Sequence, residues 1–267
     1  MKKTVTLLTL SIFAIACKQQ SNTSDTEQMT KEEVVEAKTY PEALNKVFKA
    51  HGGLDLWKMQ RTLTYTIPKE NNPETHITDL RSRNDKIETP DYTMGFDGKT
   101  WLADTNGMYK GNPEFYHNLM FYFYAMPFVL ADDGINYAYT EPLYFEGKSY
   151  PGVQITYNAG VGTSPKDEYY IHYDSETHQM AWLGYTVTYR TGEDSNNIKW
   201  IRYNDWGTFD DLVLPQSISW YNYEGREIKE LRNTVTFESI ALSKQSKPIS
   251  FYAKPENGNY WVKPDSN

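Results

Sequence analysis

Cysteine is nearly absent from this chain of 267 residues, in which Cys17 is the single one. One thiol cannot form a disulfide within the chain, and it cannot supply the several thiolates of a cysteine zinc site. Disulfides within the chain and cysteine-metal chemistry are therefore excluded.

Positive charge is also scarce. The chain has 27 Lys and Arg against 35 Asp and Glu, which gives a formal net charge of −8, and the basic residues are scattered. Nucleic-acid binding needs Lys and Arg clustered on one face, and charge-driven docking on anionic lipid needs a basic patch. We therefore expect no nucleic-acid partner.

Motifs of the common catalytic and metal sites are missing as well. The chain has no Gly-x-Ser-x-Gly elbow, no Ser-x-x-Lys pair and no His-Glu-x-x-His pattern. We predict no catalytic residue, no metal ligand and no cofactor. A triad is not visible in sequence order, so a hydrolase whose site is assembled in space is kept as a third alternative.

Two acidic pairs, Asp132-Asp133 and Asp210-Asp211, are interpreted as turns. Neighbouring residues on a strand point to opposite faces, so neither pair places two carboxylates across one sugar.

The histidines also have structural interpretations. His172 and His178 flank a predicted turn and are expected to form an exposed pair across a hairpin, which is too few ligands for zinc. His51, followed by two glycines, is expected to cap the first helix.

The N-terminal segment has the pattern of a secretory signal. Lys2 and Lys3 precede an apolar stretch from Val5 to Ala16, which is too short to span a membrane. Together with Cys17 this stretch resembles the lipobox of bacterial lipoproteins, although Ala14 stands where that motif usually has leucine. The resemblance implies that the cysteine becomes the new N-terminus and carries the lipid.

Three regions are predicted from these signals. Residues 1–16 form the lipoprotein signal peptide, and residues 17–38 form a lipidated N-terminus and flexible tether, because their polar composition offers little to bury. Residues 39–267 form a single antiparallel β-rich domain. The membrane is reached through the lipid anchor at Cys17; secretion with a free thiol is the alternative.

The domain begins with a helix and continues in strands. Leu44, Val47 and Phe48 share one helical face, and glycines follow at 52 and 53. From residue 62 onward, β-prone runs rich in Tyr, Trp, Thr, Val and Ile are separated by hairpin signals at Asp97-Gly98, Asn106-Gly107, Glu146-Gly147 and Glu224-Gly225. The predicted fold is mainly β (α+β): a curved antiparallel sheet or half-open barrel with an N-terminal helix and an apolar covering helix.

The covering helix is predicted after Asn112-Pro113, a favourable cap and first position. It runs from Phe115 to about Ala125, and Pro127 ends it. Because it is apolar almost all round, we interpret it as a lid or plug against the concave side of the sheet.

Aromatic residues are abundant, with 22 Tyr, 11 Phe and 7 Trp. They fit three interpretations: the core of a large β protein, the lining of a groove for acyl chains, or a platform on which sugars stack.

Short motifs follow one another along the domain: Ala50-His51-Gly52-Gly53 with Trp57, Phe96-Asp97-Gly98-Lys99-Thr100-Trp101, Ala125-Met126-Pro127-Phe128, and Asp167-x-Tyr169-x-x-x-x-Asp174. In these motifs the chain is similar to a family of uncharacterised outer-membrane lipoproteins from Bacteroidota. The order of lipobox, polar tether, first helix and antiparallel run interrupted by an apolar helix resembles the lipoprotein-carrier architecture of periplasmic lipoprotein chaperones and their outer-membrane receptor. The resemblance implies a half-open β-barrel that holds acyl chains beneath helices, and it transfers no catalytic residue.

We therefore predict a non-enzymatic lipoprotein of the cell envelope, anchored in the outer membrane, without preference for its periplasmic or surface face. Its ligand is expected to be apolar, such as acyl chains or a lipidated client. The alternative is an accessory glycan-binding lipoprotein of a polysaccharide-utilisation system. The predicted cavity wall consists of Trp57, Trp101, Phe121, Phe123 and Phe128.

Overall fold

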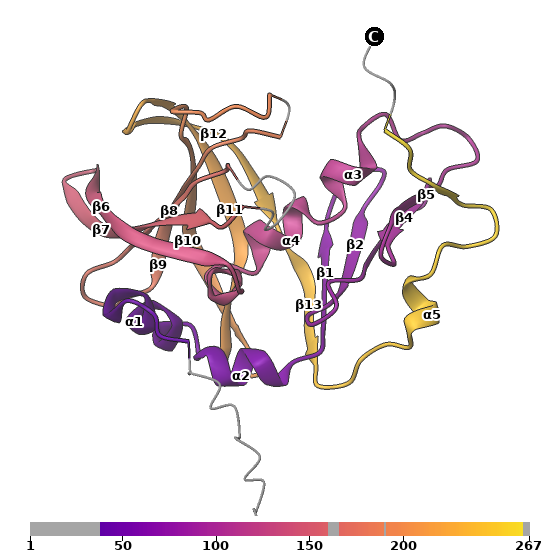
Figure 1. Ribbon diagram of the computed structural model, residues 1–267, viewed down its shortest axis with the longest axis horizontal. Coiled ribbons are helices and arrows are strands. Elements are labelled where there is room, and N and C mark those ends of the chain that lie inside the picture. Colours follow the sequence, from indigo (N-terminus) through magenta and orange to yellow (C-terminus); the bar gives the residue numbers. More distant parts are fainter. Residues whose placement is uncertain (1–37, 160–165, 190, 264–267) are drawn as a thin grey trace, which may run out of the picture. The chain divides into compact units, whose positions relative to one another are not determined.

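Antiparallel strands dominate the structure, a computed structural model (Figure 1). The structure describes residues 38–159, 166–189 and 191–263. The predicted signal peptide (1–16), the lipidation site Cys17 and the tether up to residue 37 lie outside the described residues. The described residues from Thr39 onward belong to one compact unit.

The described strands form two sheets, and the first has the order β13-β1-β2-β3-β4-β5-β14. Five of its strands are joined in sequence order, so it is largely a meander closed at each edge by a strand from the C-terminal part. The strands are β1 (Thr62–Ile67), β2 (Glu74–Asp79), β3 (Asp85–Glu88), β4 (Thr93–Phe96), β5 (Thr100–Ala103), β13 (Glu238–Ser243) and β14 (Asn259–Tyr260).

The second sheet has the order β12-β11-β10-β9-β8-β7-β6, in which every strand pairs with its neighbour in sequence. Strand β12 also contacts β6. No backbone ladder joins these two outer strands in the described part of the chain, so the sheet curves strongly but stays open. The predicted antiparallel, half-open architecture is confirmed. The strands are β6 (Ile135–Phe145), β7 (Lys148–Tyr157), β8 (Tyr169–Tyr173), β9 (Met180–Tyr185), β10 (Lys199–Phe209), β11 (Leu212–Glu224) and β12 (Glu227–Thr236).

The chain crosses from the second sheet into the first at Phe237, which lies between β12 and β13. Its N–H donates to the Gln216 carbonyl at 2.8 Å, and its buried ring makes edge contacts with Tyr65 and Tyr124. Strand β13 then pairs with β1, nearly two hundred residues earlier, with Thr62 opposite Ser243. This crossing joins the two sheets into one fold.

The helices are short: α1 (Glu42–Ala50), α2 (Leu54–Met59), α3 (Pro113–Tyr116), α4 (Leu119–Tyr124), the 3-10 helix η1 (Phe128–Ala131) and α5 (Ile249–Tyr252). Within the described ranges, none has both the length and the apolar character needed to cross a membrane.

Helix α1 follows the prediction, because Leu44, Val47 and Phe48 are its buried residues. Two glycines after His51 then turn the chain, with φ of +98° at Gly52 and +92° at Gly53. A Cβ at Gly52 would lie only 2.4 Å from the Asp211 carbonyl oxygen, so the close approach of backbone to backbone requires glycine.

Three of the four predicted hairpin signals are correct: Asp97-Gly98, Glu146-Gly147 and Glu224-Gly225 join consecutive strands. The prediction at Asn106-Gly107 is wrong. Asp104 accepts hydrogen bonds from the N–H groups of Met108 and Tyr109, which turns the chain out of the first sheet toward α3.

The acidic pair Asp210-Asp211 forms the turn between β10 and β11. Both residues have positive φ, +47° and +64°, as the favoured two-residue hairpin turn requires.

The predicted covering helix is instead two helices, α3 and α4. The Asn112 cap is confirmed, because its side-chain oxygen accepts from the Phe115 N–H at 3.2 Å. The break falls at His117-Asn118, where the side chain of His117, the C-cap of α3, pairs with Asp85 of the first sheet at 2.6 Å. A tertiary contact, which no local pattern encodes, therefore divides the segment.

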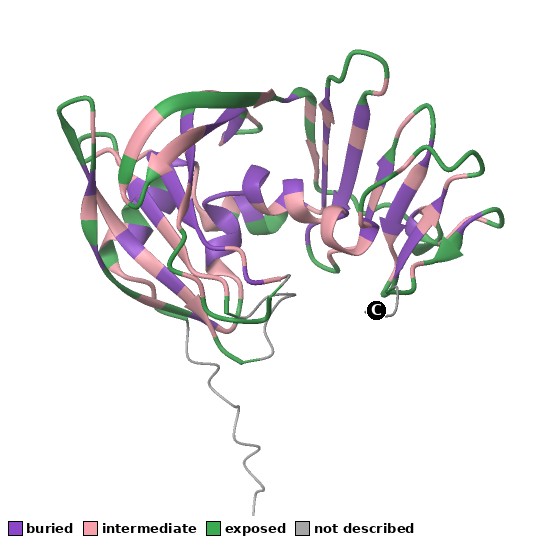
Figure 2. Ribbon diagram, turned by 90° about the horizontal axis from the view of Figure 1, so that it is seen from above, coloured by how far each residue is buried: buried purple, intermediate pink, exposed green. Residues whose placement is uncertain are grey.

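The main core lies around α4, where every residue from 123 to 130 is buried (Figure 2). It includes residues of α1, α2, α4 and η1 and apolar side chains of both sheets. A second cluster contains Trp182 and Trp200. Since Leu183, next to Trp182, belongs to the main core, β9 is buried on both faces.

Candidate functional site

A cavity of about 480 Å³ lies along α3 and α4, and we call it the α4 cavity. The helical segment supplies one wall. Strands β9 and β11, Lys199 at the start of β10 and residues between β9 and β10 supply the other. The apolar lining residues are Phe115, Leu119, Met120, Phe123, Tyr185, Val187 and Trp220.

The helical wall follows from spacing in the sequence. Phe115, Leu119 and Phe123 are four residues apart, and Met120 is three before Phe123. Such spacings place side chains on the same side of helical turns, and the interruption at residues 117 and 118 does not move them away from the cavity.

The strand wall is held by a hydrogen bond in which the Trp220 Nε1–H donates to the Tyr185 hydroxyl at 3.0 Å. The ring of Phe123 lies 5.0 Å from that of Tyr185 and 5.8 Å from that of Trp220, between ring centroids. Because these polar atoms pair with each other, the rings can border an apolar space without losing a hydrogen bond.

One side of the α4 cavity is polar. Thr191, Ser195, Asn197 and Lys199 line it there. Its volume lies in the usual range for small-molecule sites, which are mostly apolar with few polar groups. The arrangement suits a ligand with a long apolar part and a polar end.

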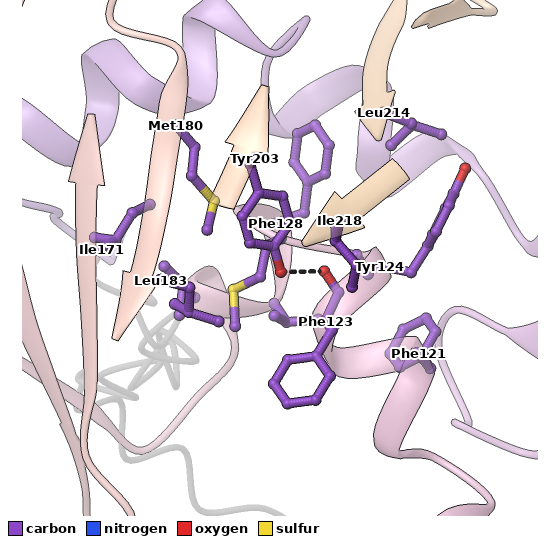
Figure 3. Close-up of a cluster of buried hydrophobic side chains, with 14 of the residues drawn as sticks. Phe121, Phe123, Tyr124, Phe128, Ile171, Met180, Leu183, Tyr203, Leu214 and Ile218 are labelled. Carbon is purple, nitrogen blue, oxygen red and sulfur yellow. Dashed lines mark hydrogen bonds between the residues drawn. The ribbon is translucent and has the colours of Figure 1, made fainter. Parts of the chain in front are cut away.

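A hydrogen bond from strand β10 fixes the C-terminal end of α4. The Tyr203 hydroxyl, fully buried, donates to the Phe123 carbonyl oxygen at 2.7 Å (Figure 3). Burial holds the pKa of this hydroxyl well above its usual value, so it remains a donor. The last carbonyls of a helix lack partners within the helix, and this bond satisfies one of them.

The residues predicted as cavity wall are found in three places. Phe123 lines the α4 cavity, and Phe121 is buried in the same core beneath the guanidinium of Arg83, 4.9 Å from the ring centroid. Trp57 and Phe128 stack on each other, with centroids 4.6 Å apart, and border a different cavity.

Trp101 lies apart from the other four residues. It is fully buried on β5, and its Nε1–H donates to the Tyr252 carbonyl at 2.9 Å. The structure thus does not bring Trp101 together with the α4 segment.

The sequence analysis did not predict most of the residues that line the α4 cavity. The spacing of Phe115, Leu119 and Phe123 could have identified the helical wall. Tyr185 and Trp220 could not have been assigned, because their meeting depends on the pairing of β9, β10 and β11.

A buried polar cluster ties α3 to the first sheet. Glu74, 1% exposed, accepts hydrogen bonds from Tyr116 (2.5 Å), Tyr92 (3.1 Å) and Lys69 (2.5 Å), and His76 lies 3.4 Å away. Burial by itself raises the pKa of Glu74, but the combined hydrogen bonds from His76, Lys69 and Tyr116 outweigh it and lower the pKa to about 2. Glu74 is therefore a charged structural anchor.

The Asp85–His117 pair lies in the same region. Phe96 stacks on the His117 ring, with centroids 5.1 Å apart. Burial raises the pKa of Asp85 although His117 opposes the shift. Within the described ranges no serine or threonine hydroxyl bonds to His117, so the pair lacks the nucleophile of a hydrolytic triad.

Two other histidines are buried. The prediction that His172 is exposed is wrong: it is fully buried on β8, with Nδ1 3.0 Å from the Tyr150 carbonyl oxygen, because β8 is an interior strand of the sheet. His51 ends α1 as expected, but its side chain reaches β9 and β11. Among the residues that the structure describes, no group of three or more His, Cys, Asp or Glu could hold a metal ion.

Several solved structures are similar to this chain at low identity. A DUF1329 family protein from Desulfovibrio piger matches with 11% identity and a TM-score of 0.42, covering 73% of this chain and 93% of that one. A LolA superfamily protein from Nitrosomonas europaea matches with 10% identity and a TM-score of 0.41, covering 82% and 99%. A putative outer membrane lipoprotein-sorting protein domain from Vibrio parahaemolyticus matches with 8% identity and a TM-score of 0.38, covering 76% and 97%. Similarity at this level carries no conclusion about function.

No curated protein matches the chain. Residues 58–226, well over half of the sequence, match the model of a family of unknown function. This stretch contains both walls of the α4 cavity and the polar cluster around Glu74. The chain belongs to the family DUF6503.

Proposed function

We propose that this protein binds an apolar ligand, such as an acyl chain or a lipidated client, in the α4 cavity and does so without catalysis. One observation carries the proposal: a cavity of about 480 Å³ is walled by apolar side chains of α3, α4, β9 and β11 and has polar residues on one side. An acyl chain would contact Phe115, Leu119 and Phe123, while its polar end would lie near Asn197 and Lys199.

The proposal includes the site of action. A lipid at Cys17, after removal of residues 1–16, would anchor the protein in the outer membrane, and residues 17–38 would tether the single domain of residues 39–267. Covalent acylation with more than one chain gives stable membrane attachment. The domain would then meet its apolar ligands at the membrane surface.

The absence of catalysis is part of the proposal, and its support is the state of the buried acid and base groups. Glu74 is held by three hydrogen-bond donors, and Asp85 by His117. Groups already paired in this way position α3 rather than face a substrate.

Native mass spectrometry tests the proposal. The full chain carrying Cys17→Ser is purified without detergent, and we expect an adduct of lipid-like mass. Val187→Trp should fill the cavity and remove that adduct, whereas Leu231→Trp, at an exposed position on β12, should retain it. A clean apo mass that stays unchanged after addition of palmitate would overturn the proposal.

A second candidate function, glycan binding, rests on a different surface. Tyr139 and Tyr144 on β6 are 79% and 70% exposed, and they line a cavity of about 580 Å³ with Glu141, Arg226 and Glu227. Exposed tyrosines next to charged groups suit stacking and hydrogen bonding to a sugar. Affinity electrophoresis in soluble polysaccharides tests it, since Tyr139→Ala should abolish any retardation.

A further inference from the structure

The stacked pair Trp57 and Phe128 borders a second cavity, of about 340 Å³, which we call the Trp57 cavity. Leu80 adds to its apolar surface. The Trp57 cavity shares no lining residue with the α4 cavity, so what it binds is independent of the function proposed above.

The charge around the Trp57 cavity is opposite to that of the whole chain. Lys58, Arg81 and Arg83 line it, against Asp132 as the one acidic lining residue, while the chain has a formal net charge of −8. Arg83 is paired with Asp132 through Nη2, at 2.7 Å from each carboxylate oxygen. In the described part of the chain, no ion pair engages Lys58 or the side chain of Arg81.

Two residues that line the Trp57 cavity have buried polar atoms without a hydrogen-bond partner. Gln60 lines it and is 2% exposed, and its side-chain oxygen has no hydrogen-bond partner. Nη1 of Arg83 is likewise buried and unpartnered. Buried polar atoms are nearly always paired in native proteins, and the Gln60 amide can turn its N–H group to the same place. Either side chain would gain the missing partner by turning to donate to a ligand in the cavity.

Two of the three basic side chains, those of Arg81 and Arg83, are presented by the turn between β2 and β3, and Lys58 lies on α2. The Asp79 carboxylate accepts hydrogen bonds from the N–H groups of Arg81 and Ser82, and the Asp79 carbonyl accepts from the Arg83 N–H at 2.9 Å. The apolar underside of the Arg83 guanidinium is packed on Phe121.

We propose that the Trp57 cavity binds the oxyanion head of an amphipathic ligand, a carboxylate or phosphate attached to an apolar group. Gln60, Lys58, Arg81 and Arg83 would donate hydrogen bonds to the oxyanion, and the apolar group would pack on Trp57 and Phe128. Charge-assisted hydrogen bonds supply the selectivity for an anion, and the stacked rings select against a bare ion.

Isothermal titration calorimetry tests this assignment on the full chain carrying Cys17→Ser, without detergent. The four probes are decanoate, decyl phosphate, decanol and inorganic phosphate. We expect at least one of the two amphipathic anions to bind about tenfold or more tighter than decanol and inorganic phosphate. Which of the two binds more tightly identifies the head group. Equal affinity for decanol, or for inorganic phosphate, would overturn the proposal.

Variants locate the binding. The double variant Lys58→Gln, Arg81→Gln changes two exposed positions. It should lower the affinity for the amphipathic anion about tenfold and reduce the salt dependence of that affinity. The matched control, Lys244→Gln with Lys263→Gln, removes the same charge from exposed positions outside the cavity and should leave the affinity unchanged. If Val187→Trp abolishes the binding while the Lys58 and Arg81 variant does not, the anion binds in the α4 cavity and the proposal is wrong.

Discussion

His51 accepts a hydrogen bond at Nε2 from the backbone N–H of Met180, 3.0 Å away and 129 residues later in the sequence. Because Nε2 accepts, the proton lies on Nδ1, which donates to the Val213 carbonyl oxygen at 3.0 Å. A single buried, neutral imidazole therefore joins the end of α1 to strands β9 and β11. The ring has no room for a second proton without losing the bond to Met180.

This arrangement predicts a loss of stability in mild acid. Burial lowers the pKa of His51 to about 4, despite the bond to Val213, from an unfolded value of 6.5. Burial lowers the pKa of His172 to about 4 as well. A lowered histidine pKa means that the unfolded chain binds the proton first, so stability is complete above pH 6.5 and falls as the pH drops toward 4. The expected loss is roughly 3 kcal/mol for each histidine.

Urea unfolding between pH 7.5 and pH 4 measures this loss. His51→Gln removes one titrating group, so the loss of unfolding free energy between these pH values should be smaller than in the parent chain by roughly 3 kcal/mol. An unchanged pH dependence in the variant would show that His51 is not the source.

The two glycines after His51 allow steric contact to be separated from backbone strain. Both have φ above +90°, but a Cβ at Gly52 would meet the Asp211 carbonyl oxygen at 2.4 Å, whereas at Gly53 nothing lies within 4 Å. Gly53→Ala should cost about 1–3 kcal/mol of unfolding free energy through strain alone. Gly52→Ala should cost more, because β11 must also move. Equal costs for the two variants, measured by urea unfolding, would contradict this geometry.

Local patterns in the sequence predicted the elements that local chemistry determines. Helix α1, the Asn112 cap and the turns at Asp97-Gly98 and Asp210-Asp211 are encoded by residues that are neighbours in the sequence. The break between α3 and α4 depends on Asp85, which comes from another part of the chain.

The candidate site divides in the same way. Phe123 was predicted as cavity wall from the apolar helix, and it lines the α4 cavity. Tyr185 and Trp220 are 35 residues apart and meet through strand pairing, as the Trp220–Tyr185 hydrogen bond shows. Trp101 and Trp57 were both predicted as cavity wall. Trp101, however, lies on a strand of the first sheet, where its indole donates to the Tyr252 carbonyl.

The lipid anchor remains a prediction from the sequence, and fractionation tests it. Cys17→Ser should move the protein from the membrane fraction to the soluble fraction, because the acylated residue is lost. The melting temperature of the domain should not change, since residues 17–38 are predicted to be a flexible tether. If the variant still fractionates with membranes, another part of the chain anchors the protein.

The attachment of α3 to the first sheet can be measured at one hydroxyl group. The Tyr116 hydroxyl donates to the buried Glu74 carboxylate at 2.5 Å, and Tyr116→Phe removes that bond and leaves the charge with one donor fewer. A hydrogen bond to a charged group contributes about 1.5–3 kcal/mol, so the unfolding free energy should fall by that amount. Amide hydrogen exchange in residues 113–124 should accelerate, because α3 and α4 are held to the first sheet through this contact.

Tyr109→Phe is the matched control for this measurement. Tyr109 contacts the Tyr116 ring, with centroids 6.3 Å apart, and in the described ranges its hydroxyl makes no hydrogen bond to Glu74. Its loss should change the unfolding free energy by less than about 0.5 kcal/mol. If Tyr109→Phe and Tyr116→Phe are equally destabilising, the cost comes from removing any hydroxyl in this cluster and not from the bond between Tyr116 and Glu74. If only Tyr116→Phe accelerates exchange in residues 113–124, the bond to Glu74 holds in place the segment that walls the α4 cavity. The same variant should then lower the affinity of this cavity for its ligand.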